Sequence, residues 1–182
     1  MMKRSGFLVA ALAATALAGL SADAQVLKGH DSNAPVNFTA DRIEVQDKAN
    51  RVVVSGNVEV TQAGLTLNAA RMTVAYHNGA SGSGVEIDRL DASGNVVVTK
   101  GDETARGNVA IYDLNKRMIT MLGNVRLTQG SNNLSGGRLI IDLTTGRSTV
   151  DGRAAPGSGG VSSSGSGRVS GTFTVPKRTQ GQ

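Results

Sequence analysis

The sequence predicts an all-β fold, built from repeated V-shaped pairs of strands. Three observations carry this prediction: apolar residues alternate with polar ones, a Gly-Asn-Val motif recurs, and small residues separate neighbouring apolar segments. Alternation with a period of two is typical of strands with one buried face. No long segment has the apolar stripe of a helix. Strand pairs of this kind must stack to bury their apolar faces, so the expected product is two facing sheets or a flattened, open-ended roll.

The first 24 residues are typical of a secretory signal peptide. Lys3 and Arg4 supply its positive charge, residues 7–20 form its apolar run, and Ala22-Asp23-Ala24 fits the small-x-small cleavage site. An apolar run of about 14 residues is shorter than the roughly 20 that a membrane-spanning helix needs. We therefore expect an exported protein whose mature chain starts at Gln25.

The mature chain divides into three parts. Residues 25–36 are polar and predict a flexible lead-in, and residues 37–153 carry the alternating pattern of the folded domain. Residues 154–182 are rich in Gly and Ser, and they have too little apolar surface to offset chain entropy. This tail is expected to be disordered, although the alternation of Val169, Phe173 and Val175 could add a short strand.

The folded part repeats itself with a period of about 29 residues. The motif Gly-Asn-Val-x-Φ-Thr, where Φ is Val or Leu, starts at Gly56, Gly94 and Gly123, and a second apolar segment follows each copy. The motif glycine has the inward parity, where a missing side chain lets a strand bend. The alternation slips at residues 69–70 and 136–137, where small residues predict a bulge or corner. An insertion at residues 76–84 interrupts the period once.

Composition excludes several kinds of chemistry. The chain has no Cys, which rules out disulfides, thiolate metal sites and cysteine nucleophiles. Its two histidines, His30 and His77, are not spaced as metal ligands, and both are expected to be surface residues. No nucleophile or dinucleotide motif is complete, so we expect no enzyme activity, no cofactor and no metal. The net charge is +5, but the basic residues are scattered without aromatic neighbours, which disfavours nucleic-acid binding.

Several ordered segments resemble the OstA-like family of periplasmic lipopolysaccharide transport proteins. These segments are TADRIEV at 39–45, SGNV at 55–58, LTLNAARM at 65–72 and GNVRLTQ at 123–129. The resemblance covers roughly residues 37–152. The insertion at 76–84 and the Gly/Ser tail depart from the family pattern, which leaves one rim and the C-terminal contact without a family precedent.

The resemblance implies a twisted, open-ended β-jelly-roll, a solenoid-like roll of antiparallel strands whose ends stack head to tail. Such a homo-oligomer would bridge the inner and outer membranes in the periplasm. It would hold the acyl chains of lipid A in an apolar groove and leave the sugar head of lipopolysaccharide in water. The implied partners are a bridge protein anchored in the inner membrane and the outer-membrane insertion complex.

Inward parity selects the expected groove lining. An aliphatic strip of this kind also forms the core of any β-sandwich, so a packed core is the alternative interpretation. The expected lining residues are Ile43, Val45, Val52, Val54, Val58, Val60, Met72, Val74, Val96, Val98, Val109, Ile111, Met121, Val125, Leu127, Leu139 and Ile141. Three arginines, Arg42, Arg71 and Arg138, recur beside inward residues and are candidate phosphate contacts at the mouth of the groove. Solvated arginines at the strand edges are the alternative interpretation. A non-catalytic scaffold that associates through its sheet edges remains the alternative function.

Overall fold

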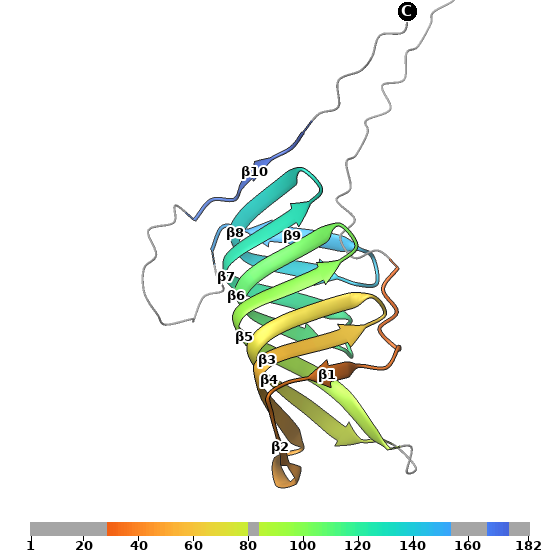
Figure 1. The fold of residues 1–182 in the computed structure, drawn as a ribbon. Coiled ribbons are helices and arrows are strands. Elements are labelled where there is room, and N and C mark those ends of the chain that lie inside the picture. Colours follow the sequence, from red (N-terminus) through yellow and green to blue (C-terminus); the bar gives the residue numbers. More distant parts are fainter. Residues whose placement is uncertain (1–28, 80–83, 154–166, 175–182) are drawn as a thin grey trace, which may run out of the picture.

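The computed structural model describes residues 29–79, 84–153 and 167–174 (Figure 1). The strands and the single short helix of this part are β1 (Asn37–Thr39), β2 (Arg42–Gln46), η1 (Asp47–Ala49), β3 (Arg51–Gln62), β4 (Leu65–Asn78), β5 (Val85–Lys100), β6 (Glu103–Asp113), β7 (Met118–Gln129), β8 (Asn132–Asp142), β9 (Arg147–Asp151) and β10 (Ser170–Thr172). The expected signal peptide and most of the Gly/Ser tail lie outside the described residues.

The strands form one antiparallel sheet in which consecutive strands from β3 to β8 are neighbours. Two short strands, β1 and β2, pair with β3 at one end, while β9 and β10 pair with β8 at the other. The sheet is folded over on itself along its length, so its two halves face each other (Figure 1). The predicted all-β, open-ended roll of V-shaped antiparallel strands is confirmed.

The long strands bend at a corner, and the Gly-Asn motif makes this corner in β3, β5 and β7. Both residues of each motif have positive φ, for example +77° at Gly56 and +44° at Asn57. The ladder register shifts at the same place in each of the three strands. Glycine adopts this left-handed conformation freely and Asn is among the residues that tolerate it, which explains why the motif pairs them. The predicted bend at the motif glycine is confirmed.

The corner divides each long strand into two halves. We call the halves that end in the hairpin turns at 63–64, 101–102 and 130–131 the first arm. The halves that end in the turns at 47–50, 114–117 and 143–146, together with the halves of β4 and β5 that meet at Asn78 and Val85, form the second arm. The side of the molecule where the turns of the two arms meet, opposite the corner, is called the mouth.

The corners of β4, β6 and β8 carry one extra residue where the Gly-Asn motif carries two. Between Val58↔Ala69 and Ser55↔Arg71, for example, β3 passes two residues and β4 passes one. Two extra residues keep the inward parity of a strand, whereas one extra residue reverses it. The slips predicted at residues 69–70 and 136–137 are confirmed as this reversal. In β6 the reversal occurs at Asn108.

The insertion at residues 76–84 lengthens the β4–β5 hairpin of the second arm. Strand pairing continues through Tyr76↔Ile87 to Asn78↔Val85, after a register shift at Ala75. The hairpin projects beyond the neighbouring strands near the N-terminal end of the sheet (Figure 1). At the other end, β10 lies between Val169 and Phe173 and pairs with the first-arm half of β8, whereas Val175 lies outside the described residues.

Candidate functional site

The interior between the two arms is aliphatic and closed in this structure. Every strand from β3 to β8 contributes at least one inward residue, and most of these side chains are 0–4% exposed. Met72 and Met121, each 0% exposed, add flexible side chains to the Val, Leu and Ile residues. The two arms therefore pack directly on each other.

Most residues expected to line the groove meet in this interior. Those found in the buried cluster are Val54, Val58, Val60, Met72, Val74, Val96, Val98, Met121, Val125, Leu127, Leu139 and Ile141, with Val52 packed against it. They run from β3 to β8 and so form a continuous aliphatic strip along the length of the sheet. Whether these residues touch lipid stays a prediction.

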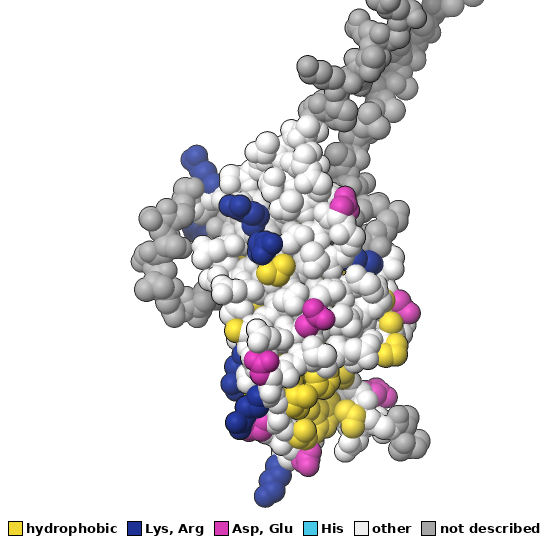
Figure 2. All heavy atoms as spheres, viewed as in Figure 1, with side chains coloured by type: hydrophobic (Ala, Val, Ile, Leu, Met, Phe, Trp, Pro, Cys, Tyr) yellow, Lys and Arg dark blue, Asp and Glu magenta, His cyan; other side chains and the backbone are white. Residues whose placement is uncertain are grey.

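Two of the expected lining residues, Ile43 and Val45, lie on β2 at the N-terminal end of the sheet and are 51% and 60% exposed. No further strand among the described residues covers β2 on its outer side. Figure 2 shows a hydrophobic patch over this end of the molecule. Val85, at the start of β5, is also exposed. The aliphatic strip therefore reaches the surface at the N-terminal end of the roll.

The prediction that Val109 and Ile111 face inward is wrong. Both residues lie on the outer side of β6, and Ala110 and Tyr112 take the inward positions, at 1% and 2% exposure. The extra residue at Asn108 reverses the parity of the strand. Ala110 pairs with Met121, so a small inward residue leaves room for a long one.

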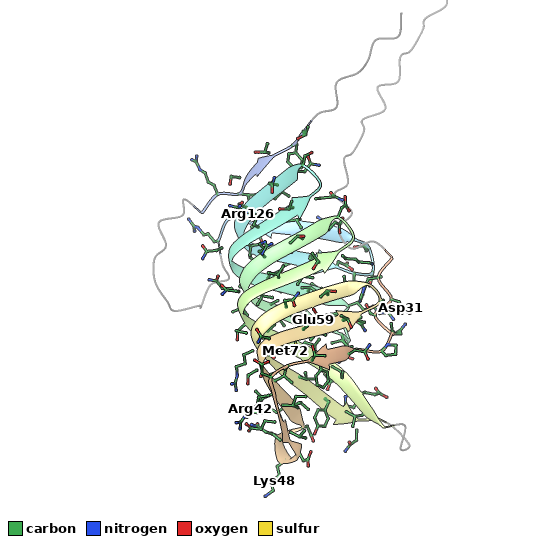
Figure 3. The ribbon with its side chains drawn as sticks, viewed as in Figure 1. Asp31, Arg42, Lys48, Glu59, Met72 and Arg126 are labelled. Atoms are coloured by element: carbon green, nitrogen blue, oxygen red, sulfur yellow. The ribbon has the colours of Figure 1, made fainter. Side chains whose placement is uncertain are left out.

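The three candidate phosphate contacts do not lie at the mouth. Arg42, Arg71 and Arg138 occupy register positions beside the corner, and Arg42 and Arg71 are exposed. Figure 3 shows Arg42 beside β2, away from the hairpin turns of the first arm. Arg138 donates two hydrogen bonds to Asp151 Oδ2, at 2.9 and 2.6 Å. A phosphate contact by these residues stays a prediction, and it would lie at the back of the roll.

A small polar cluster at the mouth was missed by sequence reasoning. Gln62 ends β3 in the first arm, Tyr112 lies in the second arm, and His30 belongs to the segment before β1. All three are buried, with 3%, 2% and 9% exposure. The expectation of a surface position is therefore wrong for His30, whereas His77 is exposed. The sequence did hold one sign that Gln62 is buried, because Gln62 continues the inward parity of Val58 and Val60.

Burial governs the electrostatics of this cluster. It lowers the pKa of His30 below 6.5, with Lys100 acting in the same direction and Gln62 and Asp31 opposing it. Burial also raises the pKa of the Tyr112 hydroxyl. Both groups are therefore neutral near pH 7.

The described residues offer little chemistry beyond binding. No group of three or more His, Asp or Glu side chains in residues 29–79, 84–153 and 167–174 is arranged to hold a metal ion. Exposed His77 lies 2.9 Å from Asp88 Oδ1 and 3.5 Å from Glu86 Oε2. Within the same ranges no helix is long and apolar enough to cross a membrane.

The fold and the interior define a class of protein: an open β-jelly-roll of V-shaped strands around a continuous aliphatic strip. The chain belongs to the family described as LptA/(LptD N-terminal domain) LPS transport protein, whose model matches residues 37–147. The family resemblance inferred from the sequence is thereby confirmed, and this family is one of transport proteins.

Two similar proteins illustrate the match. An uncharacterized protein of Rhizobium meliloti (strain 1021) is 32% identical over 92 residues, covering 49% of this chain and 50% of that protein. The chain thus aligns with about half the length of this curated relative. The crystal structure of LptH, the LptA homologous periplasmic component of the conserved lipopolysaccharide transport device from Pseudomonas aeruginosa, matches with a TM-score of 0.67 and 20% identity. The match covers 80% of this chain and 99% of LptH, and it shows the fold.

Proposed function

We propose that this chain is a periplasmic carrier that binds lipopolysaccharide and helps to pass it from the inner to the outer membrane. The acyl chains of lipid A would lie between the two arms, and the sugar head would stay in water. The observation that carries the proposal is the continuous aliphatic strip between the arms, in a chain of the LPS transport family. The periplasmic location of LptH, a component of a lipopolysaccharide transport device, supports the same location for this chain.

The physics of the interior favours alkyl chains as guests. Burying a CH₂ group contributes about 0.8 kcal/mol. When the arms part around an acyl chain, they exchange contacts with each other for contacts with the chain, so the interior stays apolar. Branched aliphatic side chains and the flexible thioethers of Met72 and Met121 can repack around such a guest.

The ends of the roll support a chain-to-chain relay. β2 and β9 are short strands of five residues at opposite ends of the sheet, and each has one neighbour among the described strands. Unpaired strand edges accept a strand from another protein. A second copy of this chain, a bridge protein anchored in the inner membrane, and the outer-membrane insertion complex are the partners we propose for these ends.

A second candidate function is a structural scaffold that works only through its sheet edges. The closed interior, with side chains at 0–4% exposure, favours this alternative. A scaffold needs no guest between its arms, whereas a carrier does.

Native mass spectrometry of the full chain, exported and purified without detergent, separates the two functions. We expect a fraction of the protein to carry the added mass of lipid A. Val58→Gln should reduce this fraction because it places an amide in the aliphatic strip. Glu59→Gln, one residue away on the outer face, is the matched control (Figure 3). Lipid-free protein that still associates edge to edge would favour the scaffold and reject the carrier.

A further inference from the structure

The segment before β1 crosses the mouth and joins the two arms. Residues 29–36, which we call the strap, run past the hairpin turns beside the end of β3 (Figure 1). Figure 3 shows Asp31 of the strap at this edge of the molecule. Even-numbered strap residues are less exposed than odd-numbered ones, as in a strand that packs on one face. Val36 packs against the aliphatic cluster where the strap leads into β1.

Gln62 is the hub of the contacts between the strap and the arms. Its Nε2 donates to the backbone oxygens of Ser32 and Ala34, at 3.1 and 2.9 Å. Its Oε1 accepts from the Tyr112 hydroxyl at 2.9 Å and lies 3.1 Å from His30 Nε2. The two backbone carbonyls fix the orientation of the amide, because a flipped amide would bring oxygen against oxygen. All four hydrogen-bonding positions of this side chain are thus used.

The hub connects elements that are far apart in the sequence. Gln62 belongs to the first arm and Tyr112 to the second arm, so their hydrogen bond spans the mouth. His30 meets the Tyr112 ring edge-on, with centroids 6.3 Å apart. A further hydrogen bond, from Arg117 of a second-arm turn to Asn33, ties the strap to the same arm at 3.4 Å.

The equivalent position in the third Gly-Asn motif, which starts at Gly123, gives a comparison. Gln129 ends β7 as Gln62 ends β3, and its Nε2 donates to Glu103 Oε1 at 2.8 Å. Glu103 also belongs to the first arm, so this bond does not span the mouth. The bond of Gln129 therefore differs from the cross-mouth bond of Gln62.

Polar contacts make the closure reversible. Such hydrogen bonds are exchanged for bonds to water on opening, whereas aliphatic packing has no such substitute. His30 Nδ1 is buried and has no hydrogen-bond partner among the described residues. A buried polar atom without a partner favours the open state, in which water can reach it. The closed strap is therefore held by a few exchangeable bonds and opposed by two buried polar atoms without a partner in the described part of the chain, His30 Nδ1 and Ser32 Oγ.

We propose that the strap is a latch that holds the two arms together at the mouth, and that its release lets an acyl chain enter from the side. Side entry rests on the proposed lipid-carrying function, whereas the latch itself rests only on the contacts between strap and arms. In the closed state the Gln62 hub keeps the arms in contact. In the released state the corner and the aliphatic packing still hold the arms together.

The latch is tested first without lipid. The chain has no Cys, so spin labels can be attached at Asp102→Cys in a first-arm turn and Lys116→Cys in a second-arm turn, both of which are exposed. Pulsed electron paramagnetic resonance then measures the distance across the mouth. Gln62→Leu should add a longer-distance population, about tenfold larger than in the parent, because several hydrogen bonds are lost together. Tyr112→Phe should add a smaller one.

Gln129→Leu is the matched control, since it makes the same change at the equivalent strand end without touching the strap. It should keep the parent distance distribution. An unchanged distribution in both Gln62→Leu and Tyr112→Phe would overturn the latch. A broadening of equal size in Gln129→Leu would overturn it as well, because the effect would then not depend on the strap.

Side entry is tested by locking the latch. Asn33→Cys and Arg117→Cys lie on the two partners of a strap contact, and a short bismaleimide can join them. Linked protein should capture about tenfold less lipid A at a photo-crosslinker placed at Val58 than the unlinked double variant. Equal capture by linked and unlinked protein would overturn side entry. Capture by neither form, with the distance changes intact, would reject the proposed function and leave the latch standing.

Discussion

Among single residues, the buried imidazole of His30 links charge to the closed mouth. Lys100 and Asp31 are the charged groups that act on its pKa, and the neutral side chains of Gln62 and Tyr112 contact its ring. Because burial lowers the pKa of His30 below 6.5, the folded state favours the neutral form of the imidazole. Protonation of His30 at low pH therefore destabilises the closed position of the strap.

The sign of the effect sets the pH window. Above about pH 6.5 the imidazole is neutral in both the folded and the unfolded chain. As the pH falls below 6.5, the unfolded chain takes up a proton first, so stability decreases until the lowered folded-state pKa is reached. We predict that the free energy of unfolding, measured with urea, drops more from pH 7.5 to pH 5.5 in the parent than in His30→Gln. The same drop in both proteins would contradict the prediction.

Sequence reasoning could not find this cluster because its partners are remote. His30 lies 32 residues from Gln62 and 82 residues from Tyr112, so no local pattern joins them. The polar character of residues 25–36 predicted a flexible lead-in, whereas residues 29–36 lie in contact with both arms. It gave no sign that two backbone carbonyls of the strap would satisfy a buried glutamine.

For the strand elements, the Gly-Asn corner decides the shape of the roll. A Cβ atom added at Gly94 would lie 2.7 Å from Cβ of Ala70, on the neighbouring strand. Glycine is required here for two reasons, since both its φ of +83° and its close contact with Ala70 exclude a side chain. The repeat stacks such corners along the sheet.

This geometry gives a matched pair of substitutions. Gly94→Ala should lower the free energy of unfolding by about 2–4 kcal/mol, from left-handed strain and steric overlap together. Gly64→Ala should lower it by only about 1 kcal/mol, because Gly64 has a similar φ of +77° but nothing within 4 Å of its added Cβ. Urea denaturation of both variants checks the difference. Equal losses would show that contact at the corner does not matter.

Strands and corners were predictable because alternation and small residues are local signals. The parity of β6 was not, because its single extra residue at Asn108 reverses the inward face. Val109 and Ile111 are the larger aliphatic residues of that strand, so a choice by size alone wrongly predicts that they face inward. Ala110 faces inward opposite Met121 of the neighbouring strand, and this pairing is a tertiary contact that the local sequence of β6 does not show.

On the scale of the whole molecule, the aliphatic strip runs from an exposed N-terminal end to β8 without a break. Open sheet ends and a polar latch at the mouth surround an interior that is closed when empty. The family resemblance and the all-β roll were available from the sequence, since repeated motifs carry both. The closed state of the interior and the strap across its mouth required the three-dimensional arrangement.

The most direct measurement is photo-crosslinking of lipopolysaccharide to inward and outward neighbours. Crosslinkers at Val58, Met121 and Val125 should yield adducts, because these side chains belong to the aliphatic strip. Crosslinkers at the adjacent outward positions Glu59, Thr120 and Arg126 should yield few, because one residue along a strand changes the face. Adducts confined to the inward positions are the predicted result. No adducts at all three inward positions, or equal yields on both faces, would contradict lipid carriage between the arms.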